Sequence, residues 1–373
     1  MVSSENGHFC DYDTNTTFFK CTLFLKIMKL KEFQGRLKEK KIDVTFLVYP
    51  DINLTYFTGQ KVSYGYLAIG CSRAVLYHTQ LDTLPVLDGV AKKLLKKGWE
   101  KSLPAKKPKV VGINKESLTL TSFERLKKLF PHAKFKDISS ILKELRAVKT
   151  KQELNYMKKA CEISVRAFES TLDELKKKKL QTEQDVALFL EKKIKEQGGE
   201  VAFPTIVAMG KNAATPHYVT SLTQLHKGFL LFDFGASYKH YCADMSRTIY
   251  LGVPNTQERE IYTLLQQVQQ AGIIGIAEGK ELIDLDKLVR QKLGKYNKYF
   301  VHSLGHGIGL EVHEAPSFVK NMKVQKNVPF TIEPGIYIPH QLGIRIEDTL
   351  YWESEKVQVL TQFPKDLITI SFL

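Results

Sequence analysis

The sequence has few cysteines, and their arrangement does not suit a disulfide-stabilised secreted protein. Its 373 residues include 5 cysteines, scattered without a CxxC pair: Cys10, Cys21, Cys71, Cys161 and Cys242. This pattern favours free thiols in a reducing compartment over a disulfide framework. We therefore expect a cytoplasmic protein.

Long apolar runs are also missing. No segment reaches the roughly 18 uninterrupted apolar residues of a membrane-spanning helix. The nearest candidate, Phe18–Met28, contains Lys20 and Lys26 and lacks a small-residue cleavage site. We expect neither a signal peptide nor a membrane anchor, and no membrane partner.

Acidic side chains are in the minority, with 40 Asp and Glu against 55 Lys and Arg and a formal net charge of +15. The basic runs are rich in lysine, poor in arginine and not interleaved with aromatic residues: Lys92–Lys93, Lys96–Lys97, Lys106–Lys107 and Lys176–Lys179. Proteins that bind nucleic acid usually combine basic and aromatic side chains. We interpret the runs as solvated surface and expect no nucleic-acid partner.

The length suggests two domains, each with its own core. Residues 28–146 alternate short apolar runs with lysine-rich helical stretches, which predicts a small α/β domain. It opens with a helical pattern and continues with a strand-like run over 44–49. Residues 1–27 show no clear periodicity, and we interpret them as an N-terminal extension.

Residues 147–373 contain four predicted helices. Three begin after Thr150, Thr182 and Thr256, and the fourth covers about 281–293. Thr182 is expected to cap the second helix, with Asp185 as its capping-box partner. Cys161 lies in the apolar stripe of the first helix, and we interpret it as a core residue because no histidine shares its segment.

Two carboxylates lie in a predicted strand hairpin between these helices. Asp233 is the charged residue of an apolar run, and Asp244 follows a turn 11 positions later. A short hairpin would bring the two side chains to neighbouring positions on adjacent strands. Like charges in an apolar setting repel each other, unless one is protonated or a cation lies between them.

A second hairpin repeats this arrangement further along the chain. Glu333 and Glu347 are 14 positions apart, again within apolar strand-like segments around a bend. Buried-type residues flank the carboxylates of both hairpins, which argues against exposed edge hairpins. The repetition predicts a pseudo-symmetric core with an acidic centre.

A histidine segment completes the set of candidate ligands. His302, His306 and His313 lie within 12 residues of one another, beside glycines that let the backbone pass close to a site. Four ionised carboxylates carry a charge of −4, which two divalent cations would neutralise. Oxygen ligands with one imidazole favour Mn²⁺ or Co²⁺, with Zn²⁺ and Fe²⁺ as alternatives. Two such ions can share a water and lower its pKa so that it attacks a carbonyl as hydroxide.

The motifs around these residues closely resemble the proline-specific branch of the pita-bread metallopeptidases, which comprises prolidases (Xaa-Pro dipeptidases) and Xaa-Pro aminopeptidases. The matching stretches are Asp-Phe-Gly-Ala, Gly-His-Gly-Ile-Gly-Leu-Glu-Val-His-Glu, Ile-Glu-Pro-Gly-Ile-Tyr and Arg-Ile-Glu-Asp. The resemblance implies an α/β creatinase/prolidase-like N-terminal domain over 28–146. It also implies an α+β pita-bread catalytic domain with pseudo-two-fold symmetry over 147–373, and a homodimer.

The resemblance also implies a role for each site residue. The metal ligands would be Asp233, Asp244, His306, Glu333 and Glu347. Glu333 would also act as general base. His217 and His313 would bind the scissile carbonyl and the developing oxyanion, so they would be both catalytic and substrate-binding. His302 would line the substrate pocket, and Arg345 would orient the ligand network at the substrate site.

The expected reaction is hydrolysis of Xaa-Pro bonds at the N-terminus of dipeptides or short peptides. Dipeptidases of the family often carry an arginine shortly after the His-Glu-x-Pro segment, where this chain has Ser317. An Xaa-Pro aminopeptidase acting on longer peptides is therefore the main alternative. A methionine aminopeptidase and a metal-free binding module on the same fold fit the motifs less well.

Overall fold

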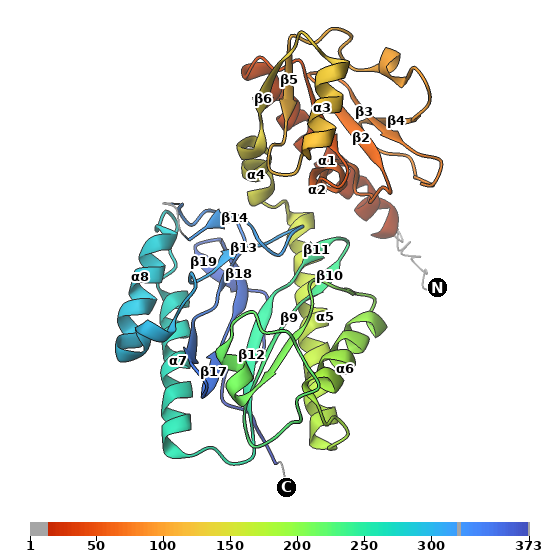
Figure 1. The fold of residues 1–373 in the computed structure, drawn as a ribbon. Helices are drawn as coiled ribbons and strands as arrows, with labels where there is room; N and C mark the ends of the chain where they lie inside the picture. Colours follow the sequence, from red (N-terminus) through yellow and green to blue (C-terminus); the bar gives the residue numbers. More distant parts are fainter. Residues whose placement is uncertain (1–13, 319–321, 372–373) are drawn as a thin grey trace, which may run out of the picture. The chain divides into compact units, whose positions relative to one another are not determined.

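The computed structural model describes residues 14–318 and 322–371 (Figure 1). The chain divides into two compact units between Leu145 and Arg146. Residues 1–13 of the expected extension lie outside the described residues, and from Thr14 the chain forms the first turns of a helix that continues to Glu39.

The N-terminal unit is an α/β domain, as expected. Its elements are α1 (Thr14–Glu39), β1 (Val44–Val48), α2 (Ile52–Thr58), β2 (Gly65–Gly70), β3 (Ala74–His78), β4 (Val90–Leu94), η1 (Trp99–Ser102), β5 (Val110–Ile113), α3 (Leu120–Leu129), β6 (Lys134–Asp137) and α4 (Ser139–Ala147). The six strands form one sheet in the order β4-β3-β2-β1-β5-β6. Strand β1 corresponds to the strand expected over 44–49 and ends one residue earlier, and all five of its residues are buried.

The second unit contains four longer helices and several small sheets. Its elements are α5 (Lys151–Lys176), α6 (Glu183–Glu196), β7 (Glu200–Val201), β8 (Ile206–Met209), η2 (Gly210–Ala214), β9 (Gly228–Phe234), β10 (Ala236–Tyr238), β11 (Tyr241–Cys242), β12 (Met245–Leu251), α7 (Thr256–Ile274), α8 (Leu282–Leu293), η3 (Gly294–Tyr299), β13 (His306–Gly307), β14 (Glu314–Ser317), β15 (Phe330–Ile332), β16 (Gly335–Ile338), β17 (Leu342–Arg345), β18 (Asp348–Glu353), β19 (Lys356–Val359) and β20 (Thr369–Ile370). Helices α5 to α8 are the four predicted from the sequence.

Helix caps explain where the first two of these helices begin. Thr182 accepts a hydrogen bond from the Asp185 amide while the Asp185 carboxylate accepts one from the Thr182 amide, which is the predicted capping box. Thr150 and Glu153 form the same reciprocal pair at the start of α5. Cys161 on α5 packs against Ala160 and Ala243, and burial raises the pKa of its thiol. It is therefore a core residue, as predicted.

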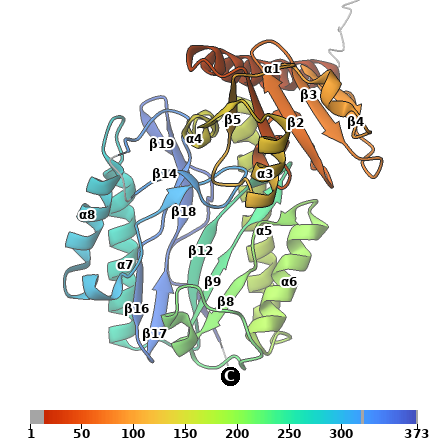
Figure 2. The same ribbon diagram turned by 45° about the horizontal axis from the view of Figure 1, so that its top comes forward.

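Two apolar cores divide the second unit into similar halves. In one, α5 and α6 cover the strands on either side of Asp233, and in the other α7 and α8 cover the strands that carry Glu333 and Glu347. Figures 1 and 2 show these helix pairs on opposite sides of the central strands. The residues that flank the carboxylates are fully buried, so the hairpins are not exposed edges: Phe232, Phe234, Ile332 and Ile346.

Strand register decides how the carboxylates face one another. Strands β9 and β12 pair with Asp233 opposite Ser246, so Asp244 lies two positions before the residue that faces Asp233. Ile332 pairs with Asp348 in the ladder of β15 with β18, and Gly335 pairs with Arg345 in the ladder of β16 with β17. The same register continued between these two pairs places Glu333 opposite Glu347. The amide of Glu347 donates to the Ser246 carbonyl at 3.1 Å and joins the two hairpins.

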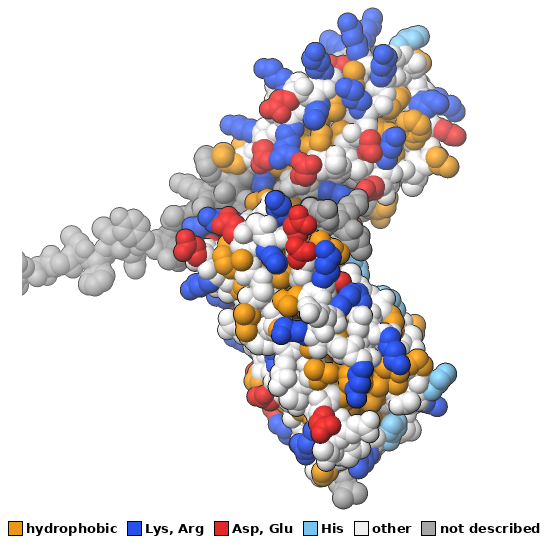
Figure 3. All heavy atoms as spheres, turned by 90° about the vertical axis from the view of Figure 1, so that its left-hand side faces the viewer, with side chains coloured by type: hydrophobic (Ala, Val, Ile, Leu, Met, Phe, Trp, Pro, Cys, Tyr) orange, Lys and Arg blue, Asp and Glu red, His pale blue; other side chains and the backbone are white. Residues whose placement is uncertain are grey.

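The basic runs lie on the surface, as predicted. All of their lysines are exposed, and Figure 3 shows basic side chains spread among acidic and apolar ones on the face that it presents. Lys176 and Lys177 pair with Asp173 and Glu174 on their own helix. Within the described part of the chain, every helix is too short or too polar to cross a bilayer.

Candidate active site

The two hairpins bring three potential metal ligands together. One ligand atom each from Asp244, His306 and Glu347 lies within 4.8 Å of the others. Glu333 joins them, since its Oε1 lies 3.3 Å from Nε2 of His306. The same imidazole nitrogen is 3.6 Å from Oδ2 of Asp244.

Glycines allow the His306 strand to pass this close. A Cβ at Gly305 would lie 2.0 Å from the Thr331 carbonyl oxygen, and one at Gly307 would lie 2.2 Å from the Ala315 backbone. Since neither glycine has a positive φ, close approach rather than backbone strain requires them. The His306 amide then donates to Oγ1 of Thr331 at 3.1 Å, and this hydroxyl donates to Glu333 at 3.1 Å.

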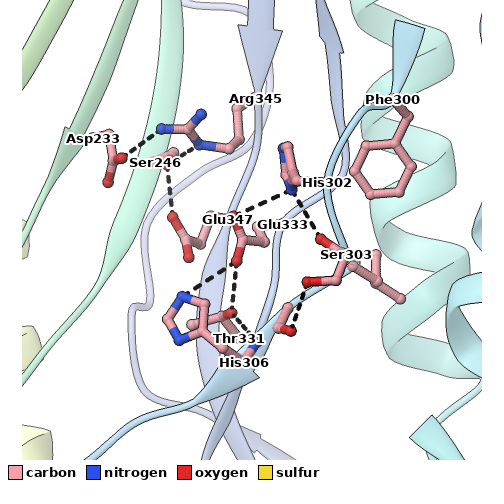
Figure 4. A network of polar contacts seen from close by, with 12 residues as sticks. Asp233, Ser246, Phe300, His302, Ser303, His306, Thr331, Glu333, Arg345 and Glu347 are labelled. Atoms are coloured by element: carbon pink, nitrogen blue, oxygen red, sulfur yellow. Dashed lines mark hydrogen bonds and ion pairs between the residues drawn. The ribbon is translucent and has the colours of Figure 1, made fainter. Parts of the chain in front are cut away.

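Arg345 connects ligand side chains through a network of hydrogen bonds (Figure 4). It is buried, and its guanidinium donates to Asp233, to Oγ of Ser246 at 2.7 Å and to the hydroxyl of Tyr337 at 2.8 Å. Ser246 in turn donates to Oε2 of Glu347 at 2.6 Å. One arginine therefore fixes carboxylates from both hairpins.

The acidic centre is electrostatically strained without a cation. Burial first, and then the neighbouring carboxylates, raise the pKa of Glu347 to about 8 and hold those of Asp244 and Glu333 well above their ordinary values. Burial and the nearby His313 lower the pKa of His306 to about 3, so its imidazole is neutral at pH 7. A neutral imidazole among carboxylates is a suitable donor set for a divalent ion.

Two oxygen atoms at the centre have no hydrogen-bond partner within the described part of the chain. They are Oδ1 of Asp244 and Oε1 of Glu347, and both are buried. Buried polar atoms are nearly always satisfied, so an unpaired carboxylate oxygen points to a missing ion or water. The residues present therefore fit a divalent metal centre.

The remaining histidines surround this centre. Nε2 of His302 lies 2.8 Å from the Tyr337 hydroxyl, and burial together with Arg345 lowers the pKa of His302 to about 4. The His313 ring lies 4.1 Å from that of His306, between centroids. His217 is exposed in the turn after η2, and its nearby imidazole contributes to lowering the pKa of both His302 and His313.

Contacts thus join the five expected ligands, His302, His313 and Arg345 in one cluster, while His217 is connected to it through its electrostatic effect on His302 and His313. Ser246 and Tyr337, which hold Arg345 and His302, were missed. The position of Ser246 opposite Asp233 was visible only after the strand register was known. Tyr337 was part of the Ile-Glu-Pro-Gly-Ile-Tyr motif and could have been inferred from its place on the strand after Glu333.

Comparison with known proteins identifies the family of this chain. Residues 155–353 match Metallopeptidase family M24, and residues 29–148 match the Creatinase/Prolidase N-terminal domain. The chain belongs to metallopeptidase family M24. It is an enzyme of this family, and the family implies divalent metal ions. The prediction of an enzyme is therefore confirmed.

Relatives match over nearly their whole length. An Xaa-Pro dipeptidase of Pyrococcus furiosus is 35% identical over 358 residues, which are 92% of this chain and 99% of the relative. The structure of an Xaa-Pro dipeptidase from Bacillus anthracis superposes with a TM-score of 0.84 at 32% identity, covering 93% of this chain and 100% of that one. An X-Pro aminopeptidase from Thermotoga maritima gives a TM-score of 0.82 at 31% identity, with coverages of 88% and 98%.

These neighbours confirm the expected fold of the M24 enzyme. An α/β N-terminal domain precedes an α+β pita-bread catalytic domain with two similar halves. The predicted resemblance to the proline-specific branch is confirmed as well, since proteins named Xaa-Pro dipeptidase and X-Pro aminopeptidase are both among the similar proteins.

Proposed function

We propose that this M24 enzyme hydrolyses Xaa-Pro bonds at the N-terminus of dipeptides and short peptides. Two divalent ions would be held by five residues: Asp233, Asp244, His306, Glu333 and Glu347. Mn²⁺ is the favoured ion, with Co²⁺ and Zn²⁺ as alternatives. The main observation behind this proposal is that ligand atoms of Asp244, His306 and Glu347 lie within 4.8 Å of one another. Each of the two carboxylates also has one buried oxygen without a hydrogen-bond partner among the described residues.

A protein side chain would accept and return the proton that the reaction transfers. When bound, the ions would polarise the scissile carbonyl and acidify the attacking water. Glu333 would accept the proton of that water and return it to the leaving proline nitrogen. Its position supports this role, because Thr331 donates to Oε1 while Oε2 faces Nδ1 of His302 at 3.9 Å.

His217 and His313 would stabilise the charge that develops on the substrate. Each imidazole can donate a hydrogen bond to the carbonyl oxygen as it becomes an oxyanion. His302 is held by the Tyr337 hydroxyl and would line the substrate pocket. Arg345 is enclosed by Asp233, Ser246 and Tyr337, so we assign it to orienting the ligands rather than to contacting the substrate.

The chemistry of the Xaa-Pro bond suits hydrolysis at a metal centre. The nitrogen of an Xaa-Pro bond has no N–H, and the ring obstructs the extended grooves of ordinary proteases. A metal-dependent site needs no backbone donor from that residue. The metal centre would also accept the free α-amino group, which explains cleavage at the N-terminus alone.

Substrate length separates two forms of this function. Ser317 occupies the place where dipeptidases of the family often have an arginine to hold the substrate carboxylate. This residue favours longer Xaa-Pro peptides, whereas the Pyrococcus furiosus relative is named as a dipeptidase. Dipeptidase activity remains the primary proposal and aminopeptidase activity the second.

One assay tests the proposed function and separates its two forms. The protein is stripped with chelator, reloaded with Mn²⁺ or Co²⁺, and given Ala-Pro beside Ala-Pro-Ala, with Ala-Ala as control. We expect cleavage of Ala-Pro that depends on the metal. Preference for Ala-Pro-Ala would establish the aminopeptidase form, and cleavage of neither by the metal-loaded protein would refute the proposal.

The homodimer and the cytoplasmic location remain predictions from the resemblance and the cysteine pattern. Light scattering coupled to size-exclusion chromatography would test the first. Cell fractionation would test the second.

A further inference from the structure

The segment that carries His217 has little regular structure of its own. After strand β8 it forms the short 3-10 helix η2, and residues 215–223 then run through turns and bends. His217 itself is exposed. A catalytic imidazole needs a fixed position, so some other group must hold this segment in place.

Glu183 makes these contacts from the first position of helix α6. The residue is 0% exposed, so its carboxylate is completely removed from solvent. Its Oε1 accepts from the Met209 amide at 2.7 Å and from Nδ2 of Asn212 at 2.8 Å. Its Oε2 accepts from the Tyr218 hydroxyl at 3.0 Å, and from the amide and hydroxyl of Ser221 at 3.3 and 3.0 Å.

These partners are all neutral, and they lie on both sides of His217 in the chain. A buried carboxylate is costly unless its oxygens are hydrogen-bonded, so Glu183 and the segment stabilise each other. Tyr218, the neighbour of His217, is one of the donors. The hydroxyl groups around this carboxylate also contact one another, Tyr218 with Ser221 and Ser221 with Thr223.

A second contact fixes η2, the part of the segment that precedes His217. A Cβ at Gly343 on β17 would lie 1.7 Å from the Ala213 carbonyl oxygen. Only glycine lets η2 pack this closely on the strand that carries Arg345. The His217 segment is therefore held between the Glu183 carboxylate and the hairpin of the metal centre.

We propose that Glu183 is a positioning residue for catalysis, which holds the turn of His217 so that its imidazole reaches the scissile carbonyl. The inference rests on the proposed function. It assigns to a buried carboxylate outside the metal centre a specific effect on the transition state. A catalytic group displaced by about 1 Å can lose roughly 100-fold in rate.

The test is a double-mutant cycle between Glu183→Gln and His217→Ala in the full chain. Glutamine keeps the size of glutamate but turns an amide N–H₂ towards groups that are themselves donors. We expect Glu183→Gln to lower kcat/KM by about 10- to 100-fold in the wild-type background, with unchanged metal content. In the His217→Ala background it should have almost no further effect. Equal losses in both backgrounds would overturn the proposal.

A second readout is independent of catalysis. Diethyl pyrocarbonate modifies accessible imidazoles, and peptide mapping by mass spectrometry gives a rate for each histidine. We expect Glu183→Gln to change the modification rate of His217 several-fold, because the turn opens more often. The rate of His132, which is exposed in the N-terminal unit, should not change.

Two further variants keep this test decisive. Tyr218→Phe removes one donor to Glu183 and should shift the His217 rate in the same direction, even if Glu183→Gln does not fold. Asp51→Asn is the matched control, because Asp51 is a buried helix-capping carboxylate with neutral donors in the N-terminal unit. It should lower the melting temperature without changing the His217 rate.

The outcomes separate the two proposals. If the wild-type enzyme does not cleave Xaa-Pro bonds, the proposed function is refuted. The rate of His217 modification would still show whether Glu183 holds the His217 turn in place. Unchanged His217 rates in both Glu183→Gln and Tyr218→Phe would overturn the positioning role, whatever the enzyme cleaves.

Discussion

Asp244 and Glu347 come from different hairpins, yet their carboxylates meet beside His306 with ligand atoms within 4.8 Å. Each keeps one buried oxygen without a hydrogen-bond partner in the described part of the chain. Burial first, and then neighbouring carboxylates, raise the pKa of both groups: Glu347 acts on Asp244, and Asp233 acts on Glu347. Such an arrangement is unfavourable for stability alone and favourable for binding a cation.

Arg345→Lys should damage the metal centre more than the fold. Lysine keeps the charge but loses the planar fork that reaches Asp233, Ser246 and Tyr337 together. We expect metal affinity or kcat to fall by about 10- to 100-fold, as for other residues that orient ligands. Titration of the stripped variant with Mn²⁺ measures this. A variant with wild-type affinity and kcat would contradict the role of Arg345.

Glu314 gives the fold an acid-sensitive contribution. Burial alone would raise the pKa of its carboxyl, but Lys149 and Arg146, with nitrogens 2.6 Å from it, outweigh burial and lower that pKa. A carboxyl whose pKa is lower in the folded state stabilises the protein above its unfolded pKa of 4.5, and this stabilisation is lost as pH falls through the folded pKa.

Glu314→Gln should therefore cost about 3–5 kcal/mol at pH 7, because it leaves the buried Lys149 without its carboxylate and Arg146 with Glu311 alone. The difference from wild type should shrink as the pH falls below 4.5. Urea denaturation of both proteins from pH 7 to pH 3 measures it. A constant difference across this range would show that ionised Glu314 adds nothing.

Gly307→Ala should displace the His306 strand. A Cβ at this position would lie 2.2 Å from the Ala315 backbone, so one of the two segments must move. We expect the free energy of unfolding to fall by about 1–3 kcal/mol and the metal affinity to fall with it. Gly35→Ala is the matched control: among the described residues nothing lies within 4 Å of a Cβ added there, and in helix α1 the change should stabilise by about 0.5–1 kcal/mol.

N-acetylation of the substrate should abolish cleavage. If the free α-amino group binds at the metal centre, acetyl-Ala-Pro-Ala should be hydrolysed at least about 100-fold more slowly than Ala-Pro-Ala, which corresponds to about 2.7 kcal/mol of lost transition-state stabilisation. Comparison of kcat/KM for the two peptides measures it. Equal values would place the amino group away from the metals.

The sequence was sufficient for the features that depend on local patterns. The four helices of the second unit followed from apolar spacing and from caps such as Thr182, and the buried hairpins followed from charges inside apolar runs. The prediction that Asp233 and Asp244 occupy neighbouring positions was less exact, since Asp233 pairs with Ser246. The turn between the two strands contains the small strands β10 and β11, which shift the register. Register depends on such turns, and their geometry is not written in the pattern of apolar residues.

Contacts between distant segments were not predictable in the same way. Glu183 reads as an ordinary residue in the first turn of a helix, and its carboxylate becomes informative only when the 209–221 segment folds over it. Glu314 likewise looked like part of a histidine motif, whereas its partners Arg146 and Lys149 come from the other end of the domain. Long-range packing, which decides burial, is absent from any short motif.

The most direct test of the account is the metal content of the chain. Stripped protein is equilibrated with Mn²⁺, dialysed, and measured by inductively coupled plasma mass spectrometry, beside Glu347→Ala and the control Glu311→Gln, whose carboxylate is half-exposed. We expect two ions per chain in the wild type and the control, and at most one in Glu347→Ala. Two ions retained by Glu347→Ala, or none bound by the wild type, would contradict this expectation.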